Sequence, residues 1–289
     1  MISSGSTSEE ADNTVFDGDW LALREPADHA ARDATMLASV WSHLKQTENP
    51  RIVDIACGRG STIAALDPDN TLGAEWHLLD QDTALLADAL NRFPAHHIRT
   101  GRCDLRSAVI SADQFGDIVP AGTDLITMSA FIDLVSLEWL AHFALRCAQR
   151  AVPVYCALSI DGTVEFDPSH VLDTPVLQAL AHHEQTDKGF GTALGPGAPY
   201  AFSAAFGRAG FVVDQAKADW KLGASEAPLA RALLDGWAEA VMESGQLEPE
   251  RADDWIRSRR QSVVDRDLVM TVGHIDAFAR LPHQDVTKL

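Results

Sequence analysis

Short apolar runs alternate with helix-like segments along much of this chain. The runs that read as strands occupy residues 53–55, 75–79, 97–103, 123–128 and 151–160. The segments between them carry apolar residues at the spacing of an amphipathic helix. Strands that alternate with helices are typical of a mostly parallel sheet covered by helices on both faces. The pattern predicts an α/β fold with a doubly wound sheet.

Extra helical patterns flank this alternating region. Residues 17–44 predict two helices before the first strand, and residues 229–243 and 249–260 predict two more near the other end. The last two strands are expected at 211–216 and 267–278, and the near-continuous apolarity of the final one indicates burial on both faces. We therefore expect a disordered tail (1–13), an N-terminal helical lid (14–48) and one binding domain (49–289), with cap insertions at about 161–200 and 218–262.

The composition narrows the classes of partner. A formal net charge of −19 repels polyphosphate, so we expect no nucleic-acid substrate. No apolar run is long enough to span a membrane, and the first dozen residues lack the basic start and apolar core of a signal peptide, so we expect a cytoplasmic protein with no membrane partner. The four cysteines lack metal-binding spacing, so we expect reduced core thiols and no metal. A homodimer is one of the assemblies that the sequence allows.

The candidate chemistry begins at the sequence Val53-Asp54-Ile55-Ala56-Cys57-Gly58-Arg59-Gly60, where an apolar strand leads through two glycines into a helix. Glycine permits a positive φ, so a ligand can approach the main chain closely at such a turn. Asp80 ends the second strand 22 residues after Gly58, at the place where a doubly wound sheet binds a ribose diol. A dinucleotide fingerprint would add a third glycine, and Ile63 stands at that position. The spacing therefore predicts an adenosine cofactor.

The stretch from Asp54 to Gly60 resembles the first motif of class I S-adenosylmethionine-dependent methyltransferases, an acidic residue followed by alternating glycines. It departs from that motif at Ala56, where the family most often has glycine. The resemblance implies S-adenosylmethionine as cofactor and a Rossmann-like sheet of seven strands, with the last strand antiparallel between the fifth and sixth. It also implies an N-terminal segment folded over the cofactor, where Arg24 could clamp the methionine carboxylate or pair with Glu25 or Asp28.

Residues after the third and fourth strands complete the expected cofactor site. In the methyltransferase pattern a carboxylate at Asp104 accepts a hydrogen bond from the adenine amino group, although Asp104 would also suit a helix N-cap. The loop after the fourth strand faces the transferred methyl group in this fold. The expected cofactor-binding residues are Arg24, Asp54, Ala56, Cys57, Gly58, Gly60, Asp80, Gln81, Asp104, Leu105 and Ser129.

The expected activity is methyl transfer to an O, N or C atom of a small-molecule acceptor. The glycine-rich run 189–197 is the candidate substrate lid, with Phe131, Asp133, Lys188 and Phe190 as acceptor-binding residues. Asp133 or His182 could act as general base. Two alternatives stay open: an NAD(P)-dependent oxidoreductase, and a cofactor-binding protein with the same fold but no catalysis.

Overall fold

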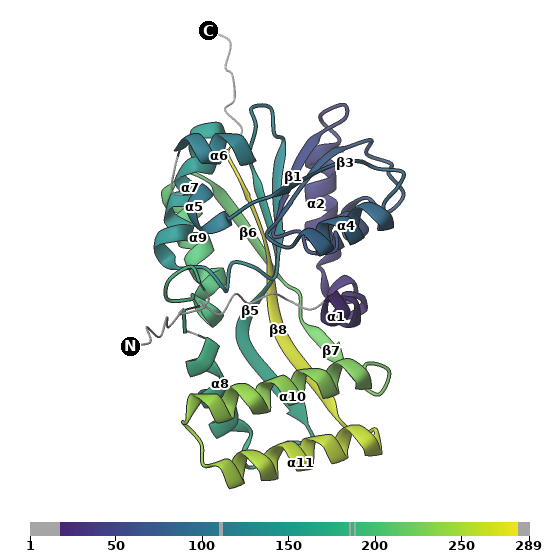
Figure 1. The fold of residues 1–289 in the computed structure, drawn as a ribbon, viewed down its shortest axis with the longest axis vertical. Helices are drawn as coiled ribbons and strands as arrows, with labels where there is room; N and C mark the ends of the chain where they lie inside the picture. The colour runs from purple at the N-terminus through teal and green to yellow at the C-terminus, as the bar shows by residue number, and fades with distance from the viewer. Residues whose placement is uncertain (1–17, 110–111, 185, 188, 283–289) are drawn as a thin grey trace, which may run out of the picture.

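The protein is an α/β structure organised around one eight-stranded sheet, seen in a computed structural model that describes residues 18–109, 112–184, 186–187 and 189–282 (Figure 1). The expectations for the tail 1–13 and for Lys188 lie outside these residues. The strands are β1 (Arg51–Ile55), β2 (Glu75–Asp80), β3 (His97–Arg102), β4 (Leu125–Ser129), β5 (Val154–Asp167), β6 (Val212–Lys217), β7 (Trp220–Leu222) and β8 (Val269–Arg280). Their order is β3-β2-β1-β4-β5-β8-β6, and β7 pairs with β8 beside that path.

The strand directions match the expected doubly wound arrangement. Strands β1 to β5 run parallel, whereas β8 lies antiparallel between β5 and β6. The prediction of a final antiparallel strand in that position is therefore confirmed. Because β1 is hydrogen-bonded to both β2 and β4, the chain reverses its direction of winding there, and such a switch point leaves a crevice at the carboxyl ends of the strands.

Two details of the sheet differ from the sequence prediction. The sheet has eight strands and not seven, because Trp220–Leu222 pairs with β8 as the additional strand β7. Strand β5 also continues to Asp167, well beyond residue 160. Two register shifts against β8 and a left-handed Gly162 (φ 80°) let β5 bend and continue where the polar residues had indicated a turn.

Helices cover both faces of the sheet. The helices are α1 (Gly18–Ala31), α2 (Ala34–Leu44), α3 (Ser61–Leu66), α4 (Thr83–Arg92), α5 (Leu105–Ala108), α6 (Ala112–Ile118), α7 (Leu137–Arg150), α8 (Asp173–Glu184), α9 (Ala198–Arg208), α10 (Ala227–Ser244) and α11 (Pro249–Asp265). Buried side chains of α2, α3 and α4 pack on one face, and those of α5, α7 and α9 pack on the other. No helix in the described part of the chain has the length and apolarity needed to cross a membrane.

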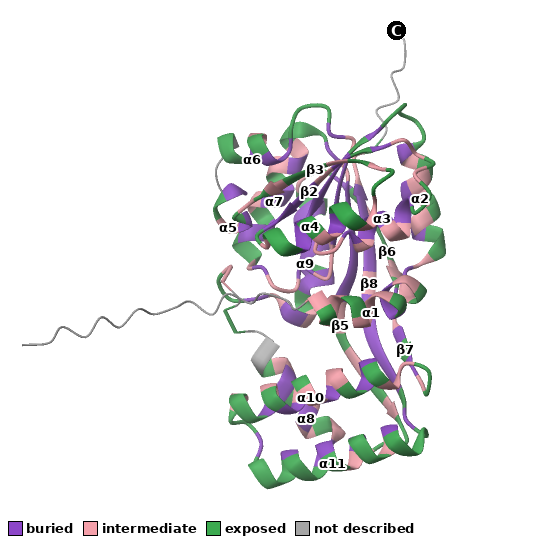
Figure 2. Cartoon of the chain, turned by 45° about the vertical axis from the view of Figure 1, so that its right-hand side comes forward, coloured by how far each residue is buried: buried purple, intermediate pink, exposed green. Residues whose placement is uncertain are grey.

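A second packing unit lies at one end of the molecule, where α8, α10 and α11 cover the extended parts of β5 and β8 (Figure 1). Its core contains Trp255, Leu234 and Val176 from the helices and Trp220 and Met270 from the strands. Figure 2 shows buried stretches alternating with exposed ones along these helices. We call this unit the helical lobe. It consists mainly of the two segments that interrupt the β-α alternation of the sequence.

Candidate functional site

The glycine turn lies at the carboxyl end of β1, in the crevice of the sheet. The backbone takes positive φ values at Ala56 (51°), Gly58 (51°) and Gly60 (80°). Gly60 is the N-cap of α3, and a Cβ atom there would lie 2.9 Å from Cε2 of Phe93. This close approach and the left-handed conformation explain why glycine occupies the position.

Asp80 is tied directly to the glycine turn. Its Oδ2 atom accepts a hydrogen bond from the Gly58 N–H (2.9 Å), and its Oδ1 atom accepts one from the Asp82 N–H (3.0 Å). Burial raises the pKa of Asp80, and the two backbone donors oppose that rise. The carboxylate is therefore fixed in place with part of its acceptor capacity still available.

Two further backbone donors of the turn are also used within the chain. The Cys57 N–H donates to the Leu79 carbonyl (3.1 Å), and the Gly60 N–H donates to the Cys57 carbonyl (2.9 Å). A phosphate-binding glycine loop offers its amide groups to the ligand. In this turn the amide groups of Cys57, Gly58 and Gly60 are not available to a ligand, because each already donates a hydrogen bond within the chain.

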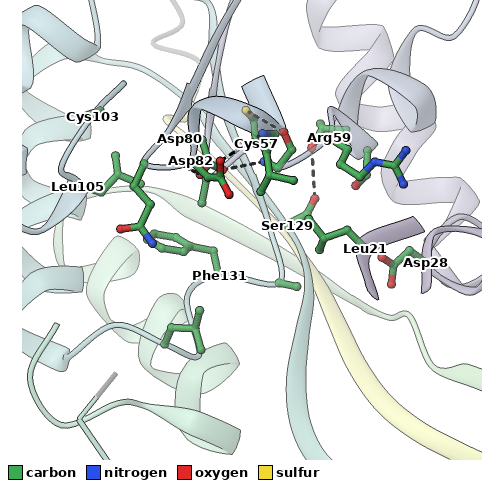
Figure 3. Close-up of a pocket in the computed structure, with 18 of the residues that line it drawn as sticks. Leu21, Asp28, Cys57, Arg59, Asp80, Asp82, Cys103, Leu105, Ser129 and Phe131 are labelled. Atoms are coloured by element: carbon green, nitrogen blue, oxygen red, sulfur yellow. Dashed lines mark hydrogen bonds between the residues drawn. The ribbon is translucent and has the colours of Figure 1, made fainter. Parts of the chain in front are cut away.

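A pocket with about 1220 Å³ of empty space, part of it open to solvent, lies in front of this turn. Figure 3 shows Asp80 and Ser129 near its centre, with Cys103 and Leu105 on one side and Leu21 and Asp28 on the other. The wall includes many of the residues expected from the sequence: Arg24, Ala56, Cys57, Gly58, Asp80, Gln81, Leu105, Ser129, Phe131 and Phe190. Helix α1 forms one side of this pocket through Leu21, Arg24, Glu25 and Asp28.

Some expected site residues lie elsewhere. Asp54 and Gly60 are not part of the pocket wall, and Asp54 is fully buried, with Thr127 Oγ1 donating to its Oδ1 (2.6 Å). Burial raises the pKa of Asp54 to about 7. Asp104 is exposed and accepts a hydrogen bond from the Arg106 N–H as the N-cap of α5, the second of the two roles the sequence allowed. His182 is exposed on α8 and lines neither this pocket nor the second cavity described next.

A second cavity adjoins the first and has about 900 Å³ of empty space, again partly open to solvent. Arg24, Ala130 and Leu134 line both cavities, so the two are contiguous at these residues. The second cavity lies between the loop after β4 and the helical lobe, and the expected catalytic residue Asp133 is in its wall. Burial raises the pKa of Asp133 to about 6, and the backbone N–H of Asp133 itself and the nearby Arg24 limit the rise.

Arg24 stands at the junction of the two cavities. Its guanidinium makes two hydrogen bonds to Asp28, from Nε to Oδ2 (2.9 Å) and from the second terminal nitrogen to Oδ1 (3.1 Å). Asp28 Oδ1 also accepts a hydrogen bond from the indole N–H of Trp220 (3.0 Å), and the Arg24 guanidinium lies 4.9 Å from the Trp220 ring centre. The pairing with Asp28 is one of the two roles expected for Arg24, but it is buried and not on the surface.

The glycine-rich run 189–197 contacts both cavities. Backbone N–H groups of Leu194 and Gly195 donate to the carbonyls of Val135 and Asp133, which hold the run on the loop after β4. Phe190 lines the first pocket and packs edge-to-face on Phe131 (5.5 Å between ring centres), whereas Pro196 lines the second cavity. The run therefore covers the boundary between the two.

A buried arginine beneath the site was not among the residues predicted from the sequence. Arg32 donates hydrogen bonds to Ser129 Oγ (2.8 Å) and to the hydroxyl of Tyr155 (3.3 Å). Tyr155 in turn donates to Asp276 Oδ2 (3.1 Å), which places a carboxylate of β8 in the same network. The sequence offered one sign of this network, the acidic residue Asp276 within a mostly apolar strand.

No family model matches this chain, and no curated protein matches it by sequence. Solved structures of methyltransferases are similar to it. Geranyl diphosphate C-methyltransferase from Streptomyces coelicolor A3(2), solved with Mg²⁺, geranyl diphosphate and S-adenosyl-L-homocysteine, is 12% identical, with a TM-score of 0.41 over 86% of this chain and 77% of that one. The cyclopropane synthase MmaA2 from Mycobacterium tuberculosis is 14% identical, with a TM-score of 0.44 over 91% of this chain and 94% of that one.

The YcgJ protein from Bacillus subtilis is 12% identical to this chain, with a TM-score of 0.48 over 86% of this chain and 100% of that one. TM-scores and identities this low carry neither an acceptor nor a reaction over to this chain.

Proposed function

We propose that this protein transfers the methyl group of S-adenosylmethionine to a small-molecule acceptor. The observation that carries the proposal is the fixed carboxylate of Asp80, which lines the first pocket beside a tight glycine turn at the switch point of the sheet. A carboxylate held there can accept hydrogen bonds from both hydroxyl groups of a ribose. The cofactor would supply the methyl group and a neutral thioether as leaving group.

Backbone N–H groups of the turn already donate hydrogen bonds within the chain, which favours S-adenosylmethionine over a nicotinamide dinucleotide. A pyrophosphate needs backbone N–H groups, yet those of Gly58 and Gly60 are bonded to Asp80 and to the Cys57 carbonyl. The pocket wall carries four carboxylates, those of Glu25, Asp28, Asp80 and Asp82, and three guanidinium groups, those of Arg24, Arg59 and Arg106. These charges nearly balance, so the choice between the two cofactors rests on the backbone donors that the chain already uses. Methyl transfer therefore agrees better with the pocket than hydride transfer does.

The neighbouring cavity supports transfer over simple cofactor binding. Methyl transfer needs an acceptor atom in line with the carbon–sulfur bond and little other machinery. Ser129 and Phe131 line the first pocket, and Asp133 lines the second, so the loop after β4 joins the two. A cofactor bound by Asp80 would leave the second cavity for the acceptor.

A calorimetric titration tests the cofactor assignment. We expect S-adenosylhomocysteine to bind and NADH not to bind under the same conditions. Asp80→Asn keeps an oxygen that can accept from the Gly58 N–H but loses the charge, so its affinity should fall about tenfold, since a hydrogen bond to a charged group contributes roughly 1.5–3 kcal/mol. Asp117→Asn, an exposed carboxylate of α6, is the matched control. Binding of NADH with no binding of S-adenosylhomocysteine would refute the proposal.

A further inference from the structure

We propose that the second cavity binds the methyl acceptor, and that this acceptor is an uncharged, flat apolar molecule whose hydroxyl group donates a hydrogen bond to Asp133. This inference rests on the proposed function, because it names the substrate class of the same site. The shape of the cavity, its hydrogen-bonding groups and its charges each support this inference.

The walls of the cavity favour a flat apolar ligand. Three indole rings, those of Trp20, Trp220 and Trp237, line it together with aliphatic side chains of β5, α8 and α10. Trp220 is held by its hydrogen bond to Asp28 and by its contact with the His274 ring, 4.8 Å between centres. Aromatic side chains on several walls contribute large apolar areas and stack well on planar rings.

The wall of the cavity holds two hydrogen-bond acceptors, Asp133 and His274, beside donors on Arg24, Thr163 and the tryptophans. Asp133 Oδ1 is buried and has no hydrogen-bond partner among the residues that the structure describes. His274 Nδ1 lies 3.0 Å from the Val272 carbonyl, and since a carbonyl only accepts, Nδ1 carries the proton and Nε2 is the acceptor. Burial and the neighbouring Arg24 lower the pKa of His274 to about 4, so this ring stays neutral. Asp133 as a whole is half-buried and lines the cavity, so a ligand that donates a hydrogen bond has a carboxylate acceptor in the wall.

The charges around the cavity disfavour an ionic acceptor. Arg24 is the one lysine or arginine side chain among the described residues of its wall, and Asp28 already binds it in a two-bond pair. An anionic acceptor would bring a second negative charge to Asp133 without gaining a free cation. A cationic acceptor would be repelled by Arg24, whose charge is felt in this wall despite the pair with Asp28, because it lowers the pKa of His274 there. A neutral hydroxyl compound avoids both penalties.

The hydroxyl donor also completes the chemistry. The acceptor oxygen forms a bond to the methyl carbon, the carbon–sulfur bond breaks with its electron pair on sulfur, and the hydroxyl proton passes to Asp133. The products are a methyl ether, the thioether form of the cofactor and a protonated Asp133, which returns its proton to solvent. With its pKa near 6, the Asp133 carboxylate is a stronger base than an ordinary aspartate and is still ionised at neutral pH.

A set of four naphthalene probes tests the proposal by calorimetry on the full chain saturated with S-adenosylhomocysteine. The probes are 2-naphthol, naphthalene, 2-naphthoate and 2-naphthylmethylammonium, which share one ring system and differ in charge and hydrogen bonding. We expect 2-naphthol to bind at least about tenfold more tightly than naphthalene, and both ions to bind more weakly than 2-naphthol.

Three variants locate the site. In Asp133→Ala the preference for 2-naphthol over naphthalene should fall below about threefold while naphthalene still binds, and in the control Asp117→Ala it should stay unchanged. Ala181→Phe, which puts a ring into the second cavity from α8, should abolish probe binding and leave the affinity for S-adenosylhomocysteine within about threefold.

Distinct results overturn the inference. A hydroxyl preference that persists in Asp133→Ala refutes the role of that carboxylate, and tightest binding of either ion refutes the substrate class. Failure of all four probes to bind a protein that binds S-adenosylhomocysteine refutes the acceptor site. Failure of S-adenosylhomocysteine itself to bind refutes the proposed function, a separate result.

Discussion

Ionisation of the half-buried Asp133 carboxylate should lower the stability of the folded protein at neutral pH. Its folded-state pKa, about 6, lies above the ordinary value of 3.8, so the fold favours the protonated form. The stability that this protonated form contributes is complete below the ordinary pKa and is lost as the pH rises through the folded-state pKa. Asp133→Asn removes the ionisation and keeps the shape. The variant should therefore gain stability over the wild type as the pH rises.

The size of the effect follows from the pKa. Each pKa unit corresponds to about 1.4 kcal/mol, so ionising Asp133 in the folded protein costs roughly 3 kcal/mol at high pH. The new amide N–H groups could add a constant penalty, because they also need partners in a buried site. That penalty does not vary with pH. We therefore expect the stability difference between variant and wild type to shift in favour of the variant by roughly 2 kcal/mol between pH 4 and pH 8.

Urea denaturation of both proteins at several pH values measures this shift, with unchanged m-values as the test that the compared states are the same. Asp117→Asn removes an exposed carboxylate and should show no comparable trend. A stability difference between Asp133→Asn and the wild type that stays constant from pH 4 to pH 8 would show that Asp133 ionises freely. It would also remove the support that its pKa gives to its role as a base.

The other predictions concern folding and the support of the site. Gly60→Ala should destabilise the protein by about 1–3 kcal/mol in urea denaturation, because its Cβ would meet Phe93 at a positive φ. Gly207→Ala, in α9 with no atom near the new Cβ, should be neutral or stabilising. Arg32→Met should cost about 3–5 kcal/mol, since Asp276 loses a buried cation, whereas the exposed Arg208→Met should change stability little. Equal stability of the two arginine variants would contradict the network.

The glycine turn and Asp80 were predictable because the signals are local. A short apolar strand, two glycines at positions of positive φ, and a carboxylate at the end of the next strand each leave a mark in a few neighbouring residues. Parallel pairing of β1 with β2 then brings the two strand ends together without further information. The same holds for β8, whose apolarity on both faces indicated a central strand.

The second cavity was not predictable in this way. Trp20, Ile160, Trp237 and His274 meet there from α1, β5, α10 and β8, and nothing in the local pattern of any one of them indicates the other three. Strand β7 was missed because three residues are too short for a pattern, and Arg32 because an arginine near a helix end usually faces solvent. These features depend on tertiary packing that local periodicity does not encode.

The direction of the strands explains why the helical lobe stands beside the cofactor pocket. Strand β5 runs parallel to β1 and β4, so its extension beyond residue 160 must project past the carboxyl edge where the glycine turn lies. Strand β8 is antiparallel and therefore begins in that same region. Helix α8 follows β5, and helix α11 precedes β8. Because both helices are attached to these strand ends, they pack in front of that edge. The lobe thus adds a wall to the sheet without altering the turn, so changes within it should alter the choice of acceptor and spare the binding of the cofactor.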